Sequence, residues 1–153
     1  MLMGRRKKGK KVLAGGSFNI VHQGHVFFLN RAKELGNTLV VVIASDRTVI
    51  KNKKHLLLPA EKRKKVVEML GIADKVIIGS DSDFFRVVEK ERPDIISLGH
   101  DQKLPKGLAR RIREKFPECR ILRIRSKLRG YSTSGILKQL GIGDDKNKNG
   151  GKD

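Results

Sequence analysis

Two histidines three residues apart, His22 and His25, stand between a short apolar segment and a helical pattern. The N-terminus of a helix presents free backbone N–H groups and the positive end of the helix dipole, which favour anions. Gly15 and Gly16 come just before, and glycine lets a ligand approach the backbone closely. Two imidazoles at this place suit a polyphosphate whose negative charge grows in a transition state. No cluster of Asp, Glu or Cys accompanies them, so the sequence indicates no dedicated zinc site.

The segments that must position these histidines alternate between apolar runs and helical patterns five times. Strands are predicted at residues 11–16, 38–44, 75–79, 94–98 and 120–124. Helices are predicted at residues 24–35, 59–70, 81–91, 106–116 and 132–140. This alternation is typical of the α/β class and predicts a Rossmann-like single domain, a five-stranded parallel sheet with helices on both faces. Ligands bind such sheets at the carboxyl ends of the strands, near a topological switch point.

Local signals indicate how two of these helices begin. Asp81 or Ser82 is expected to cap the helix at 81–91. Pro59 opens the helix at 59–70. The apolar residues expected to share one face of that second helix are Val66, Val67, Met69 and Leu70.

The length of 153 residues predicts one domain with a hydrophobic core. We place that domain at residues 11–142, after a basic tail at 1–10 and before a low-complexity, disordered tail at 143–153. The single cysteine, Cys119, excludes an internal disulfide framework. No run approaches the roughly 20 apolar residues that cross a bilayer, so we expect a cytoplasmic protein without a membrane segment.

Lysine and arginine together number 35 against 16 Asp and Glu, which gives a net charge of +19. The excess is concentrated at residues 1–11, 47–65 and 103–129, which carry +6, +7 and +9. This clustering points to a polyanionic partner, which is either a nucleic acid or a small phosphorylated molecule.

The residues 16–25, GSFNIVHQGH, resemble the G-T-F-D-x-x-H-x-G-H signature of the nucleotidylyltransferase superfamily. The resemblance spans roughly residues 12–140 and includes a P-x-E-x-R helix start at 59–63. Two positions depart from the signature. Ser17 replaces threonine and keeps the hydroxyl, whereas Asn19 replaces the usual aspartate, so a role that needs a carboxylate there is in doubt.

The resemblance implies the superfamily reaction, in which the phosphate of an acceptor attacks the α-phosphorus of an NTP and pyrophosphate leaves. Catalysis of this kind consists mainly of positioning and charge stabilisation. By resemblance, His22 and His25 are the catalytic residues, and Ser17, Phe18 and Gly24 bind the nucleotide. Mg²⁺ is expected with the nucleotide, held largely by phosphate oxygens, and no tightly bound organic cofactor is expected.

Further contacts are carried over in the same way. The residues 131–134, YSTS, resemble a family segment whose hydroxyls and N–H groups face the triphosphate, which assigns Ser132 and Thr133 to nucleotide binding. Arg63 matches a family arginine that contacts substrate. One lysine among residues 51–54 is expected to bind phosphate, with Lys51 as the named candidate.

The branch of the superfamily is indicated by residues 98–102, LGHDQ, which resemble the L-G-x-D-Q of archaeal FAD synthases. That branch transfers AMP from ATP to FMN, and its aspartate lies in the ATP site, so Asp101 is expected to contact the nucleotide. The alternative is a cytidylyltransferase that uses CTP and glycerol 3-phosphate or a similar phospho-alcohol, because the STS segment is slightly more similar to that branch. The cysteine-containing C-terminal segment of some archaeal FAD synthases has no counterpart here.

Two other classes compete with a small-molecule transferase. A basic nucleic-acid-binding protein would show salt-dependent affinity that depends on residues 5–11 and 103–129. One tyrosine and six phenylalanines offer little for base stacking, so this class is less favoured. A tRNA-synthetase fragment would share the histidine motif, but the chain has no K-M-S-K-S loop. A homodimer is expected only by analogy.

Overall fold

The computed structural model describes residues 9–52, 54–81 and 83–125. The expected helix at 132–140, with Ser132 and Thr133, lies outside the described residues, as do the tail at 143–153 and most of the tail at 1–10. Within the described ranges, no helix is long and apolar enough to cross a membrane.

Five parallel strands form one sheet in the order β3-β2-β1-β4-β5. The strands are β1 (Lys11–Gly16), β2 (Thr38–Ile43), β3 (Lys75–Ile78), β4 (Ile95–Leu98) and β5 (Arg120–Arg123). The chain builds β2 and β3 on one side of β1 and then crosses to build β4 and β5 on the other. The switch point therefore lies between β1 and β4, and the predicted α/β class and parallel sheet are confirmed.

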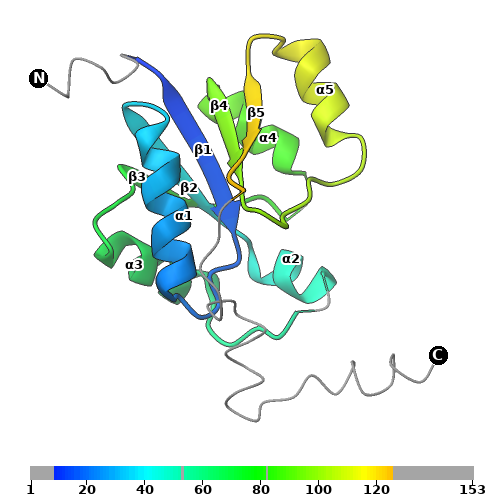
Figure 1. Ribbon diagram of the computed structural model, residues 1–153. Helices are drawn as coiled ribbons and strands as arrows, with labels where there is room; N and C mark the ends of the chain where they lie inside the picture. Colours follow the sequence, from blue (N-terminus) through cyan, green and yellow to red (C-terminus); the bar gives the residue numbers. More distant parts are fainter. Residues whose placement is uncertain (1–8, 53, 82, 126–153) are drawn as a thin grey trace, which may run out of the picture.

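Helices cover both faces of this sheet (Figure 1). On one face, α1 (Gln23–Glu34) and α3 (Ala60–Met69) bury Leu29, Ala32 and Val67 against β1 and β2. On the other face, α4 (Phe84–Glu91) and α5 (Leu108–Lys115) bury a second apolar cluster. A short helix, α2 (Asp46–Lys51), follows β2 at the carboxyl edge.

The residue pattern of the central strands explains why two separate clusters form. Side chains of a strand alternate between faces, so Val12 and Ala14 of β1 join the α1 side while Leu13 joins the α4 side. In β2, five consecutive residues from Leu39 to Ile43 are buried, as expected for a strand covered on both faces.

Two local features differ from the sequence prediction. The helix α2 was not predicted, because it is six residues long and buries only Val49; Ser45 caps it by accepting the Thr48 N–H at 3.1 Å. The prediction that Asp81 or Ser82 caps α4 is wrong. Asp83 is the cap, since its carboxylate accepts the Phe85 N–H at 3.0 Å.

Candidate functional site

The histidine pair, His22 and His25, lies at the start of α1 on the carboxyl edge of the sheet. His22 is the N-cap, and its Nδ1 accepts the backbone N–H of Gly24 at 3.0 Å. The backbone N–H of His22 is donated to Nδ1 of His25 at 3.2 Å. The two ring centroids are 4.0 Å apart. Because both Nδ1 atoms accept a backbone N–H, each neutral ring carries its proton on Nε2 and can donate it to a ligand.

The surroundings of the pair keep both rings neutral. Burial lowers the pKa of His22. Burial, the neighbouring His22 ring and the Lys54 ammonium together lower the pKa of His25 to about 4. At neutral pH the pair therefore offers hydrogen-bond donors and not positive charges. A neutral ring with its Nδ1 lone pair already used and a proton on Nε2 also has no free lone pair for a metal ion, so the pair suits phosphate oxygens better.

We expect this low pKa to make the folded protein less stable in mild acid. The unfolded chain protonates His25 near 6.5, whereas the folded chain does so only near 4. Between these pH values the unfolded state binds more protons, so the free energy of unfolding falls as the pH falls, by up to about 3 kcal/mol. Urea unfolding of the unmodified protein and of His25→Gln at pH 4 to 7 measures this. The variant should lose less stability across the range, and equal losses would contradict the assignment.

The turn between β1 and α1 is built around Phe18. This residue is buried and has a positive φ of 54°, a conformation that side chains other than glycine rarely adopt. Its ring lies against Gly16, where an added Cβ would come within 3.0 Å of the ring, so only glycine fits there without a shift. The centroid of the same ring is 5.1 Å from that of His25. The ring of Phe18 therefore packs against the histidine pair. The backbone of Phe18 is strained at the place where the ligand is expected.

Arg63 lies beneath the site and binds protein atoms on all sides. Its side chain is fully buried and donates four hydrogen bonds of 2.7–2.8 Å. The acceptors are the carbonyl oxygens of Ser17, Ala44 and Leu58 and the carboxylate of Asp46. The guanidinium thus joins the ends of β1 and β2 to the starts of α2 and α3. In this arrangement it positions the site and does not face a ligand.

Asn19, the departure from the family signature, also joins two segments. Its side-chain N–H donates to the carbonyl oxygen of His55 at 2.5 Å, and its side-chain oxygen accepts the Leu57 N–H at 3.4 Å. A carboxylate has no N–H to donate, so an aspartate here could keep only the second contact. The amide is therefore matched to the loop that precedes α3.

The LGHDQ segment at the end of β4 is tied to the end of β1. Gln102 accepts the Gly99 N–H at 3.1 Å and donates to the Gly15 carbonyl oxygen at 3.1 Å, which spans the switch point. Arg123 of β5 supports the same turn by donating to three of its carbonyl oxygens. Asp101 is 83% exposed, with its carboxylate 3.6 Å from Nε2 of His100. Its carboxylate is thus accessible at the carboxyl edge of the sheet, the edge at which the sequence placed Asp101.

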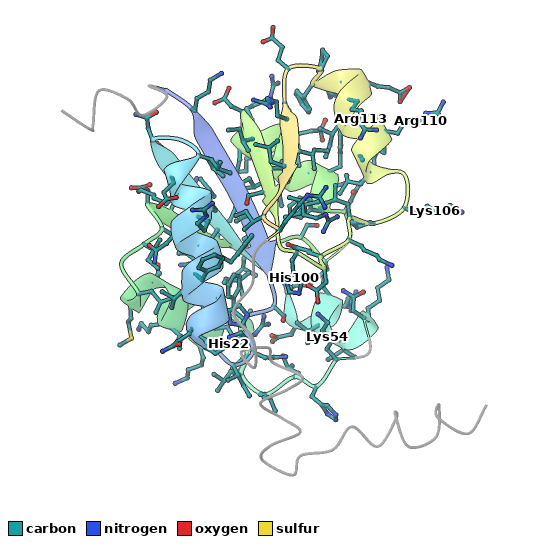
Figure 2. The ribbon with its side chains drawn as sticks, viewed as in Figure 1. His22, Lys54, His100, Lys106, Arg110 and Arg113 are labelled. Carbon is teal, nitrogen blue, oxygen red and sulfur yellow. The ribbon has the colours of Figure 1, made fainter. Side chains whose placement is uncertain are left out.

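Some basic residues lie at the carboxyl edge of the sheet, near the histidine pair, and others lie at or near α5. Figure 2 shows His22, Lys54 and His100 at the lower end of the sheet, whereas Lys106 lies in the loop before α5 and Arg110 and Arg113 lie on α5. Lys51 and Lys54 are both exposed. Lys54 alone of the two is near enough to His25 to lower its pKa. Of these two lysines, the structure thus brings Lys54 to the histidine pair.

Of the expected site residues, the structure brings together His22, His25, Phe18 and the backbone of Ser17. The N–H of Gly24 is already donated to His22, and Arg63 is buried below. Sequence reasoning missed the positioning residues Asp46, Gln102 and Arg123. Arg63 was expected to contact substrate, and its burial was missed. The spacing of Ala60, Arg63 and Val67, three and four residues apart on one face of α3, is a signal that could have indicated it.

Comparisons with known proteins show what the whole chain is similar to. The model of the cytidylyltransferase-like family matches residues 13–139. An FAD synthase of Ferroglobus placidus is 43% identical over 119 residues, which cover 77% of this chain and 78% of the relative. An FAD synthase of Methanothermobacter marburgensis is 40% identical over 142 residues, or 89% of this chain and 88% of the relative. A crystal structure titled as a lipopolysaccharide core biosynthesis protein from Thermoplasma volcanium is 36% identical with a TM-score of 0.72, and covers 78% of this chain and 98% of that chain.

Proposed function

The chain belongs to the cytidylyltransferase-like family and is a nucleotidyltransferase, and on that premise we propose that it transfers AMP from ATP to FMN to give FAD and pyrophosphate. The observation that carries the proposal is the pair of neutral imidazoles held side by side at the N-terminus of α1. Relatives similar over most of their length bear the name FAD synthase, which supports ATP and FMN as the substrates.

In this reaction an oxygen of the FMN phosphate attacks the α-phosphorus of ATP. The bond from that phosphorus to the oxygen bridging to the β-phosphorus breaks, and pyrophosphate leaves with the electron pair. The phosphate of FMN is already an anion, so the protein need not supply a nucleophile. Its task is to align the two substrates and to stabilise the negative charge that develops on the phosphate oxygens.

The N–H groups at Nε2 of His22 and His25 perform the second task. As neutral donors they are oriented in advance by the hydrogen bonds at Nδ1, so little reorganisation accompanies the reaction. Lys54 supplies positive charge beside them, and we assign to it the phosphate-binding role that the sequence left open among residues 51–54. Arg63 acts as a positioning residue, because it holds the backbone of Ser17 and the start of α2 in place.

Mg²⁺ would enter this site with ATP. Mg²⁺ prefers oxygen ligands and binds mostly to phosphates and water, which fits a site whose imidazoles present N–H groups. Asp101 offers an exposed carboxylate at the same edge and could contribute an oxygen. When bound, the ion would neutralise part of the charge on the triphosphate.

A nucleotide-by-acceptor screen tests the proposed function. ATP and CTP are each combined with FMN, glycerol 3-phosphate, phosphopantetheine, nicotinamide mononucleotide and a sugar 1-phosphate, and pyrophosphate release is measured. We expect release with ATP and FMN and FAD as the second product. Release with CTP and glycerol 3-phosphate in its place would support the cytidylyltransferase alternative, and release with no pair would overturn the proposed function.

The same assay separates the two lysines. Lys54→Met should lower kcat/KM more strongly than Lys51→Met, because only Lys54 acts electrostatically on His25. Equal effects of the two substitutions would contradict the assignment of Lys54.

A further inference from the structure

Three consecutive leucines are exposed beside the candidate site. Leu56, Leu57 and Leu58 expose 36%, 40% and 38% of their surface. They precede α3 in what we call the leucine loop, residues 55–58. Single exposed apolar side chains are common, but a contiguous group of large ones next to a polar site marks a place where something binds.

The backbone of the leucine loop is hydrogen-bonded to two side chains of the protein, and its three leucines are partly exposed. Asn19 binds the His55 carbonyl oxygen and the Leu57 N–H, and Arg63 donates to the Leu58 carbonyl oxygen at 2.8 Å. Both anchoring side chains are buried. These contacts hold the backbone of the loop in place, while the three leucines keep part of their surface accessible.

The chemistry around the leucine loop defines the kind of ligand that would fit. Asn19 connects the loop directly to the turn that carries the histidine pair. Lys54 immediately precedes the loop and acts on His25. Phosphate-binding groups and an apolar surface thus meet at one place, which suits a phosphate monoester whose other end is large and apolar.

We propose that the leucine loop is the surface on which the isoalloxazine ring of FMN packs while its phosphate lies at the histidine pair and Lys54. The inference rests on the proposed function and adds the determinant of acceptor choice. A flat three-ring system gains from contact with leucine side chains, whereas glycerol 3-phosphate has no apolar part to place there. The leucine loop therefore selects FMN over small polar phosphate esters.

Replacing leucine by asparagine in this loop tests the proposal. In Leu57→Asn and in Leu56→Asn/Leu57→Asn we expect the KM for FMN to rise about tenfold or more, with the KM for ATP and the melting temperature unchanged. Met69→Asn is the matched control, because Met69 is an apolar residue of α3 with 80% exposure outside the loop. It should leave both KM values unchanged.

Quenching of flavin fluorescence measures FMN binding without catalysis and separates this inference from the proposed function. Weaker FMN binding in the loop variants, with no FAD made by the unmodified protein, would support the flavin surface and overturn the proposed function. FAD formation with an unchanged KM for FMN in both variants would overturn the flavin surface alone. A lowered melting temperature with both KM values raised would also overturn it, since the leucines would then be a packing surface for another part of the chain.

Discussion

Replacing His25 by alanine is expected to lower kcat for FAD formation by about 10²–10³-fold, the usual cost of removing one preorganised donor to a developing anion. The ring of His25 is fixed from three directions, by the His22 N–H, by the His22 ring and by Phe18. These contacts therefore fix the orientation of its Nε2–H before the substrate binds. The measurement is steady-state pyrophosphate release at saturating ATP and FMN.

His25→Gln provides the matched control. The glutamine side chain can place an N–H near the position of Nε2, so this variant should retain more activity than alanine. A histidine that acted as a cation would not be rescued by a neutral amide. Full activity in His25→Ala would refute the proposed role, and equal loss in both variants would show that the imidazole does more than donate a hydrogen bond.

Replacing Arg63 by methionine is expected to cause the largest loss of stability, about 3–5 kcal/mol, because it removes a buried donor from several acceptors, each of which costs about 1–3 kcal/mol when left unsatisfied in the interior. Three carbonyl oxygens and the carboxylate of Asp46 lose their donor at once. The melting temperature should fall by on the order of 10 °C. Thermal unfolding followed by circular dichroism measures the shift.

Lys62→Met is the control for this prediction. Lys62 is exposed on the same helix, one residue before Arg63, and exposed substitutions usually change stability by less than about 0.5 kcal/mol. Arg63→Lys should restore little, since an ammonium lacks the planar fork that reaches four acceptors. If Arg63→Met unfolds at the same temperature as Lys62→Met, the buried guanidinium does not hold the strand ends together.

The alternation of apolar runs and helical patterns was enough to predict the sheet and the helices α1, α3, α4 and α5, and the strand predictions agree with β1 to β5 to within one residue at either end. The histidine spacing was enough to predict two rings at one place. These features are local, because each depends on residues close together in the sequence.

The side of a helix that faces the core was harder to predict. Val66, Val67, Met69 and Leu70 were expected to share the apolar face of α3, yet Met69 is exposed and the buried face contains Ala60, Arg63 and Val67. In the run of four basic residues at 62–65, only tertiary contacts distinguish the buried arginine from the lysines around it. Gln102 was missed for the same reason, as its partner Gly15 is far away in the chain.

The strand order has a consequence for how the protein is made. The contact between Gln102 and Gly15 joins residues 87 positions apart, and contacts of such separation form slowly because a long loop must first close. A growing chain that has not yet produced β4 has no switch point and thus no complete place for its substrates. Binding of ATP and FMN would then stabilise only the finished fold, so that substrate supply favours molecules that have completed folding.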